Sequence, residues 1–160
     1  MSNDKPLVGV IMGSASDSDV MQKCIDALKE LEVPHEIRML SAHRTPDLTR
    51  EYAVSAADRG IELIIAGAGL AAHLAGFIAA YTSLPVIGVP IDSSPFRGMD
   101  SLLSMVQMPP GIPVATVAVG TPGAKNAAVL AVQILALKYP RFAERLNDYR
   151  KDLAKKLEKN

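Results

Sequence analysis

The chain has 160 residues, a length typical of a single domain, and we expect one domain over residues 1–160. Its 17 basic and 17 acidic side chains cancel, so it lacks the basic surface that nucleic acids and anionic membranes attract. Apolar residues make up 49% of the chain and aromatic residues 4%, which predicts an aliphatic core and argues against base-stacking surfaces. The single cysteine, Cys24, excludes an internal disulfide and a multi-cysteine metal centre, and favours a reducing cytoplasm.

The sequence predicts neither secretion nor membrane insertion. Residues 1–6 lead into an apolar run that is too short for a signal peptide. Residues 63–81 form the longest apolar stretch, but Gly67, Gly69 and Gly76 interrupt it and no Lys, Arg or Trp anchors flank it closely. We interpret this stretch as a buried strand, a turn and a small-residue helix.

Short apolar runs alternate with amphipathic stretches along the chain, a pattern typical of parallel strands covered by helices. Most of the runs are almost continuously apolar, as expected of strands buried on both faces. The predicted strands are residues 7–12, 36–40, 63–66, 85–89 and 114–119. The pattern therefore indicates an α/β fold with a five-stranded sheet.

The stretches between these runs have apolar side chains at helical spacing. The expected buried face of the first helix is Val20, Met21, Cys24, Ile25, Leu28 and Leu31, and that of the second is Leu48, Tyr52 and Ala56. Further helices are predicted at 99–107, 126–137 and about 140–159, after a domain core of about 7–138. The last helix has a narrow stripe that packs either on this domain or on a neighbour: Phe142, Leu146, Tyr149, Leu153 and Leu157.

Ligands of open parallel sheets bind beyond the carboxyl ends of the strands, so the segments after the strands are the candidate sites. Gly13, Ser14, Ser16 and Asp17 follow the first strand at the predicted start of a helix. Free backbone N–H groups and two hydroxyls there favour an anion such as a phosphate. The alternative is ordinary helix capping, for which Ser and Asp are preferred. The segment lacks the lysine of a nucleoside-triphosphate loop.

The segment after the second strand has an imidazole beside a guanidinium. Thr45 and Pro46 mark the start of the next helix, which leaves Ser41, His43 and Arg44 in the loop with no capping role. A histidine transfers protons near neutral pH, and an arginine binds carboxylate or phosphate. This loop is therefore a candidate catalytic segment, with a solvated histidine as the alternative.

Residues 67–72, after the third strand, match the dinucleotide fingerprint G-x-G-x-x-A, with Asp92 at a suitable distance. The fingerprint normally follows the first strand of a fold, so we interpret this match as coincidental and as a sign of close backbone approach. His73 follows in the next helix and faces either a ligand or a packed interior. The three histidines have no metal-ligand spacing, and no metal is predicted.

Five sequence blocks together resemble the N5-carboxyaminoimidazole ribonucleotide mutase family of purine biosynthesis. The resemblance spans roughly residues 7–150 and rests on MGSASD at 12–17, SAHRTPD at 41–47, AGAG with AAHL at 66–74, PVIGVP at 85–90, and DSLLS running into VQMP at 100–109. It implies a flavodoxin-like three-layer α/β/α sandwich with a central parallel sheet. It also implies a cytoplasmic homo-octamer and a cofactor-free isomerase, with a small-molecule substrate and no nucleic-acid or membrane partner.

The resemblance also assigns roles to individual residues. The substrate and its ribose phosphate would contact Ser14, Ser16, Asp17, Ser41, Ala42 and Arg44. His43 falls on the catalytic histidine of the family, which carries the proton. The loop that would enclose released carbon dioxide includes Gly69, Ala71 and His73.

The chain departs from the family pattern at two positions of this loop. Leu70 replaces a usual second glycine, and Ala75 replaces a usual proline. If that glycine has a positive φ, either Leu70 is strained or the loop follows another path. Two alternative functions stay open: a related carboxylase that uses free carbon dioxide, and a non-enzymatic dinucleotide-binding module.

Overall fold

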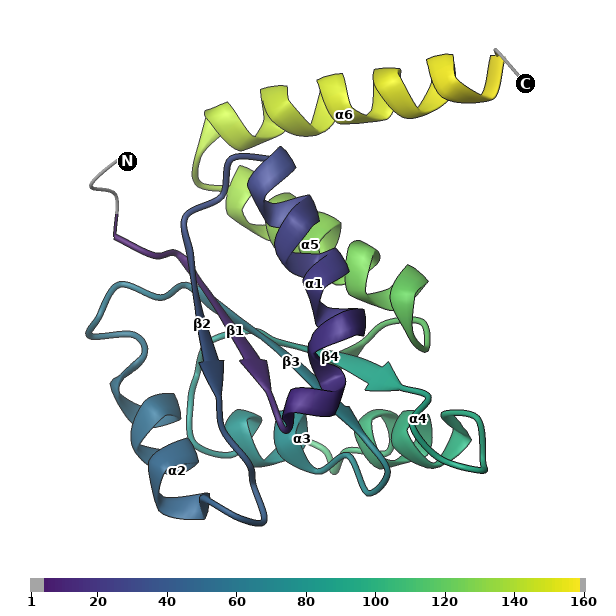
Figure 1. Cartoon of the computed structure of the whole chain (residues 1–160). Helices are drawn as coiled ribbons and strands as arrows, with labels where there is room; N and C mark the ends of the chain where they lie inside the picture. The colour runs from purple at the N-terminus through teal and green to yellow at the C-terminus, as the bar shows by residue number, and fades with distance from the viewer. Residues whose placement is uncertain (1–4, 159–160) are drawn as a thin grey trace.

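Five parallel strands form one sheet in the order β2-β1-β3-β4-β5 (Figure 1). This computed structural model describes residues 5–158. The strands are β1 (Val8–Met12), β2 (His35–Met39), β3 (Leu63–Gly69), β4 (Val86–Ile91) and β5 (Ala115–Thr116). The predicted number of strands and their parallel arrangement are confirmed. Only β5 is much shorter than predicted, because beyond Thr116 the chain keeps single hydrogen bonds to β4, from Val117 N to Gly88 O and from Gly120 N to Pro90 O.

Helices cover both faces of the sheet. They are the 3₁₀ turn η1 (Ala15–Asp17) and the helices α1 (Ser18–Glu30), α2 (Pro46–Ser55), α3 (Leu74–Ala79), α4 (Met99–Val106), α5 (Thr121–Ala136) and α6 (Pro140–Glu158). One face packs against α1 and α5, and the other against α2, α3 and α4 (Figure 1). The three-layer, flavodoxin-like architecture is confirmed. No helix within residues 5–158 is both long and apolar enough to cross a bilayer.

The central strands read as apolar runs because both of their faces are buried. Along β1, Val10 packs into the layer of α1 and α5, whereas Ile11 packs into the layer of α2 and α3. The edge strand β2 does not follow this rule, since Ile37 and Met39 are 44% and 55% exposed. β2 is therefore the exception among runs that are mostly buried on both faces, as its charged residues Glu36 and Arg38 already suggest.

The first two helices differ in how well their buried faces were predicted. The stripe of α1 is confirmed, and Cys24 within it is fully buried. Burial raises the pKa of its thiol to about 12. On α2 the prediction is wrong for Leu48, which is 55% exposed. The buried face of α2 instead includes Thr49 and Ala53, one residue further along the helix.

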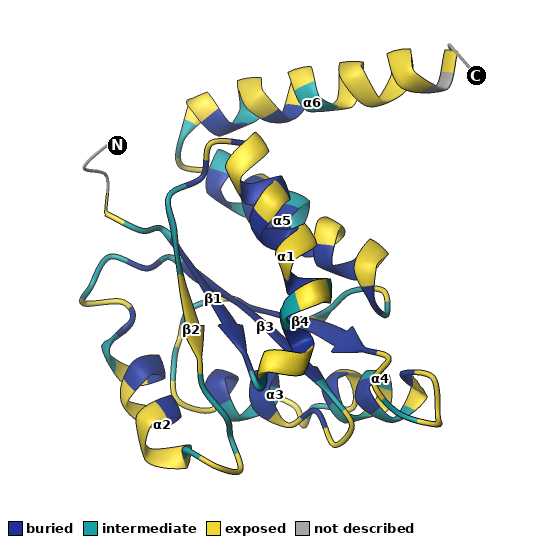
Figure 2. Ribbon diagram, in the orientation of Figure 1, coloured by how far each residue is buried: buried dark blue, intermediate teal, exposed yellow. Residues whose placement is uncertain are grey.

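The C-terminal helix α6 divides into a packed half and an exposed half. Phe142 and Leu146 are buried against the α1 and α5 layer, and Tyr149 packs on its edge. Figure 2 shows that the rest of the helix is mostly exposed, and Leu153 is 44% exposed. The side chain of Leu157 lies outside the described residues. The first part of the predicted stripe thus packs on its own domain.

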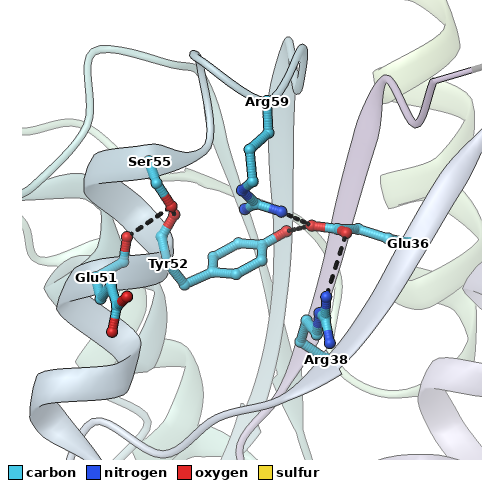
Figure 3. Close-up of polar contacts among 6 residues, drawn as sticks. All are labelled: Glu36, Arg38, Glu51, Tyr52, Ser55 and Arg59. Atoms are coloured by element: carbon cyan, nitrogen blue, oxygen red, sulfur yellow. Dashed lines mark hydrogen bonds and ion pairs between the residues drawn. The ribbon is translucent and has the colours of Figure 1, made fainter.

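A polar cluster ties α2 and the loop after it to the edge strand β2 (Figure 3). The Glu36 carboxylate accepts hydrogen bonds from Tyr52 OH at 2.7 Å and from Arg59 Nη1 at 2.5 Å. Arg38 Nη2 lies 3.8 Å from the same carboxylate. The Tyr52 hydroxyl lies above Gly9 of β1, where a Cβ atom would come within 2.3 Å of it, so only glycine leaves room for the ring. Burial raises the pKa of Glu36, but the bonds from Arg59 and Tyr52 outweigh it, and the net pKa lies below the ordinary value.

Replacing Glu36 with Gln is expected to lower the free energy of unfolding by about 1–3 kcal/mol, because hydrogen bonds to a charged group are lost. Since folding lowers the pKa of Glu36, its contribution is complete above the unfolded pKa and disappears as pH falls through the folded pKa. Denaturant unfolding at neutral and acid pH measures both effects. Glu51→Gln, the same change at an exposed position of α2, is the control. Equal stability of the two variants at neutral pH would contradict the prediction.

Candidate active site

The candidate site lies where the order of strands reverses. From β1 the chain crosses to β2 on one side and then returns to β3 on the other, so the segments after β1 and β3 diverge at the carboxyl ends of their strands. Such a reversal leaves a crevice in which the ligands of open α/β sheets bind. A cavity of about 490 Å³ occupies this place.

All the residues that the sequence analysis selected line this one cavity. They are Ser14, Ser16 and Asp17 after β1, Ser41, Ala42, His43 and Arg44 after β2, and Gly69, Ala71 and His73 at the end of β3 and beyond. Five further residues complete the lining: Gly13, Ala68, Leu70, Leu74 and Ser93. Of these, Ser93 went unnoticed in the sequence. It is the second residue after β4, so the rule of inspecting every strand end would have found it.

The segment after β1 turns two hydroxyls and a carboxylate toward the cavity. Ser14 Oγ accepts a hydrogen bond from Ser16 N at 3.2 Å and lies 2.9 Å from Ser16 Oγ. Ser14 thus caps η1, as the structural alternative predicted, and its hydroxyl still lines the cavity. Asp17 is only 4% exposed. Burial raises its pKa, and backbone groups of Ser14 and Gly13 together with the charge of Arg44 oppose that rise.

The segment after β2 is held by its own hydrogen bonds. Ser41 Oγ accepts from Arg44 N at 3.1 Å, a bond within the loop that does not cap α2, so Ser41 has no helix-capping role, as predicted. Thr45 occupies the N-cap position before Pro46 as predicted, but its hydroxyl accepts from Ser41 N at 2.9 Å and does not cap the helix. Arg44 Nη2 donates to Gly13 O at 2.9 Å, which joins this loop to the segment after β1.

Two histidines that are 30 residues apart in sequence meet in the cavity. His43 Nε2 lies 2.8 Å from His73 Nδ1, and the rings meet edge to face with centroids 4.9 Å apart. One imidazole donates this hydrogen bond and the other accepts it, so the contact fixes the tautomers of both rings relative to each other. His73 occupies the N-cap position of α3 and makes no capping bond with its side chain. A pair of this kind can take up and release a proton at the cavity.

The glycines after the predicted third strand belong to the strand itself. Gly67 and Gly69 lie inside β3, so the turn that a dinucleotide fingerprint requires is absent here. A Cβ on Gly67 would lie 2.3 Å from Met21 Sδ, and one on Gly69 would lie 1.9 Å from Ser93 Oγ. The interpretation of the match as coincidental is confirmed. The close approach is to side chains of the protein itself.

Leu70, the first residue after β3, has a left-handed backbone with φ of 56°. The first of the two alternatives for this departure, a strained leucine, is confirmed. For a residue with a Cβ this conformation costs about 1–2 kcal/mol more than for glycine. Ala75, the other departure, is fully buried in α3.

The family model described as AIR carboxylase matches residues 7–156, nearly the whole chain. The chain belongs to the AIR carboxylase family. Among members of this family, it is 60% identical over 158 residues to N5-carboxyaminoimidazole ribonucleotide mutase of Pyrococcus horikoshii, a match that covers 99% of this chain and 88% of the relative. It is 56% identical over 148 residues to the Bacillus subtilis protein of the same name, covering 92% of this chain and 91% of that one.

A solved structure of the AIR carboxylase family has the same fold. The crystal structure of PurE from Treponema denticola matches with a TM-score of 0.82 and 34% sequence identity, covering 96% of this chain and 95% of that chain. The AIR carboxylase family thus accounts for the architecture over almost the full length of both chains.

Proposed function

We propose that this member of the AIR carboxylase family is an N5-carboxyaminoimidazole ribonucleotide mutase, an isomerase of purine biosynthesis. It moves the carboxylate of its substrate from the exocyclic nitrogen to ring carbon 4, giving 4-carboxy-5-aminoimidazole ribonucleotide. The observation that carries the proposal is the 60% identity over 158 residues with a relative named for this activity.

The segments that follow β1 and β2 would hold the ribose phosphate. The hydroxyls of Ser14 and Ser16 and the guanidinium of Arg44, which is hydrogen-bonded to Gly13 beside Ser14, all line the cavity and form a set suited to phosphate oxygens. Asp17 lies beside them and would accept hydrogen bonds from ribose hydroxyls. Ser41 and Ala42, which also line the cavity, would contact the substrate from the loop after β2.

His43 would carry the proton. When the bond from nitrogen to the carboxylate carbon breaks, carbon dioxide leaves and the nitrogen takes up a proton. When ring carbon 4 attacks the carbon dioxide, a new carbon–carbon bond forms and that carbon loses its proton. The two steps balance, so one imidazole can give the proton and take it back. The hydrogen bond to His73 would hold the ring of His43 in place for both steps. Gly69 and Ala71, which also line the cavity, would help to enclose the carbon dioxide.

A labelling assay tests this function. The enzyme receives N-carboxylated substrate with an unlabelled carboxylate, in buffer containing a chelator and isotopically labelled bicarbonate. A mutase transfers the unlabelled carboxylate to carbon, so we expect little label in the product. Product that forms only with added bicarbonate, and that is fully labelled, would instead show the carboxylase activity that uses free carbon dioxide.

We also propose that the chain assembles into a homo-octamer in the cytoplasm, the reducing compartment favoured by its single cysteine. The small residues of α3 do not support assembly, because Ala75 and Ala79 are buried within their own chain. The outer face of α4 does, since Met99, Leu103 and Val106 are 56%, 49% and 50% exposed and form an apolar surface. Light scattering at micromolar concentration is expected to give about eight times 17.0 kDa. A monomer mass independent of concentration would refute the octamer.

A further inference from the structure

Leu70 stands out among the strained residues of the chain. Within residues 5–158, three residues other than glycine have positive φ: Glu32, Leu70 and Arg97. Of these, only Leu70 lines the candidate active site. A bulky side chain in this backbone region is rare, and strain of this kind concentrates where a site needs it.

The backbone conformation on either side of Leu70 is constrained by one close contact and by hydrogen bonds between residues near in sequence. Just before it, Gly69 lies so close to Ser93 that a side chain there would collide with the hydroxyl. After it, Ala72 N donates to Leu70 O at 2.9 Å and His73 N donates to Ala71 O at 2.7 Å. These contacts use the backbone and leave the leucine side chain free. It is 56% exposed while still lining the cavity, so it lies at the cavity rim.

The side chain of Leu70 is chemically unlike most of its surroundings. The exposed and half-exposed groups of the lining are hydroxyls, imidazoles, a guanidinium and small alanine or glycine positions. The other leucine of the lining, Leu74, is 3% exposed and serves the core. Leu70 is therefore the one large apolar side chain of this lining that is free to cover a bound molecule. Exposure of this apolar side chain to water is unfavourable in free energy, and the side chain would gain that free energy back by packing over a bound ligand.

We propose that Leu70 is a specificity-determining residue, an apolar cover that keeps released carbon dioxide in the cavity until the ring carbon takes it up. This inference rests on the proposed function, in which carbon dioxide forms beside His43 and the loop of Gly69 and Ala71. An apolar side chain at the rim excludes water from that place and interacts well with a small uncharged molecule. The residue thus favours transfer within the site over exchange with the solution.

Leu70→Asn tests the cover, because asparagine has nearly the same size, tolerates the left-handed backbone and is polar. Leu70→Gly removes the side chain and relieves the strain, so its melting temperature is expected to equal or exceed that of the wild type. Leu137→Asn, at a position 90% exposed at the end of α5, is the matched control.

All four proteins receive unlabelled N-carboxylated substrate with labelled bicarbonate, and the labelled fraction of the product is measured. We expect both Leu70 variants to raise this fraction at least threefold above the wild type and Leu137→Asn, and to accumulate more decarboxylated by-product. A labelled fraction in Leu70→Asn and Leu70→Gly equal to that of the wild type would overturn the inference. If the wild type forms no product from the substrate, the proposed function itself is refuted. This outcome is seen in the wild-type measurement alone and is therefore distinct from a failure of the inference about Leu70.

Discussion

His43→Asn is expected to lower turnover by about 10²-fold or more, the usual loss when a general acid–base group is removed. The residue is exposed in the cavity, so the substitution leaves the core untouched. Asparagine retains hydrogen-bonding capacity but cannot shuttle a proton. Binding of the product, measured by calorimetry, is expected to change much less than turnover. The side chains proposed to hold the phosphate are those of Ser14, Ser16 and Arg44, and the substitution leaves all three in place.

A second histidine provides the control for this experiment. His35 lies on β2, where its Nδ1 is 2.7 Å from Val33 O, and it does not line the cavity. His35→Asn is therefore expected to keep normal turnover. Near-normal turnover in His43→Asn would remove His43 from the proposed mechanism and leave His73, its partner at 2.8 Å, as the candidate proton carrier.

Arg44→Gln is expected to raise KM for the ribonucleotide by about 10- to 100-fold, the effect of losing a charge-assisted hydrogen bond of about 1.5–3 kcal/mol. Loss of the Arg44 charge also changes the pKa of Asp17. Burial raises the pKa of Asp17 and the charge of Arg44 opposes the rise, so removing that charge raises the pKa further. The increase in KM at acid pH should therefore begin at a higher pH in the variant than in the wild type.

Steady-state kinetics across pH measures both effects of Arg44→Gln. Arg50→Gln, at an exposed position of α2 outside the cavity, is the control and is expected to keep the wild-type KM. An unchanged KM in Arg44→Gln, with normal thermal stability, would mean that the phosphate lies elsewhere in the cavity.

The sequence predicted the fold well wherever burial alone decides the pattern. The central strands are buried on both faces, and the stripe of α1 follows helical spacing, so both are visible as runs or periods of apolar residues. At the edge of the sheet and on the helix beside it, an apolar residue does not reliably indicate burial. Leu48 is apolar yet exposed, and β2 carries Ile37 and Met39 on its surface, because their environment depends on what lies beside the sheet edge.

The residues that line the candidate site could be selected from the sequence because the topology brings together the segments that follow parallel strands. The selected residues therefore share one cavity although they come from three separate segments. The contact between His43 and His73 was not predictable, because it depends on how two loops approach each other across the sheet edge. Ser93 carries no motif, and although its place near the end of β4 could have been inspected, its closeness to Gly69 is visible only in the structure.

The burial of Cys24 gives this protein a built-in reporter. The chain has one thiol, it is fully enclosed between α1 and the sheet, and burial raises its pKa to about 12. Only the thiolate reacts quickly with disulfide and alkylating reagents, so the native protein hides its sole reactive sulfur from them. The rate of chemical modification then follows the opening of the α1 layer, with no background from other cysteines.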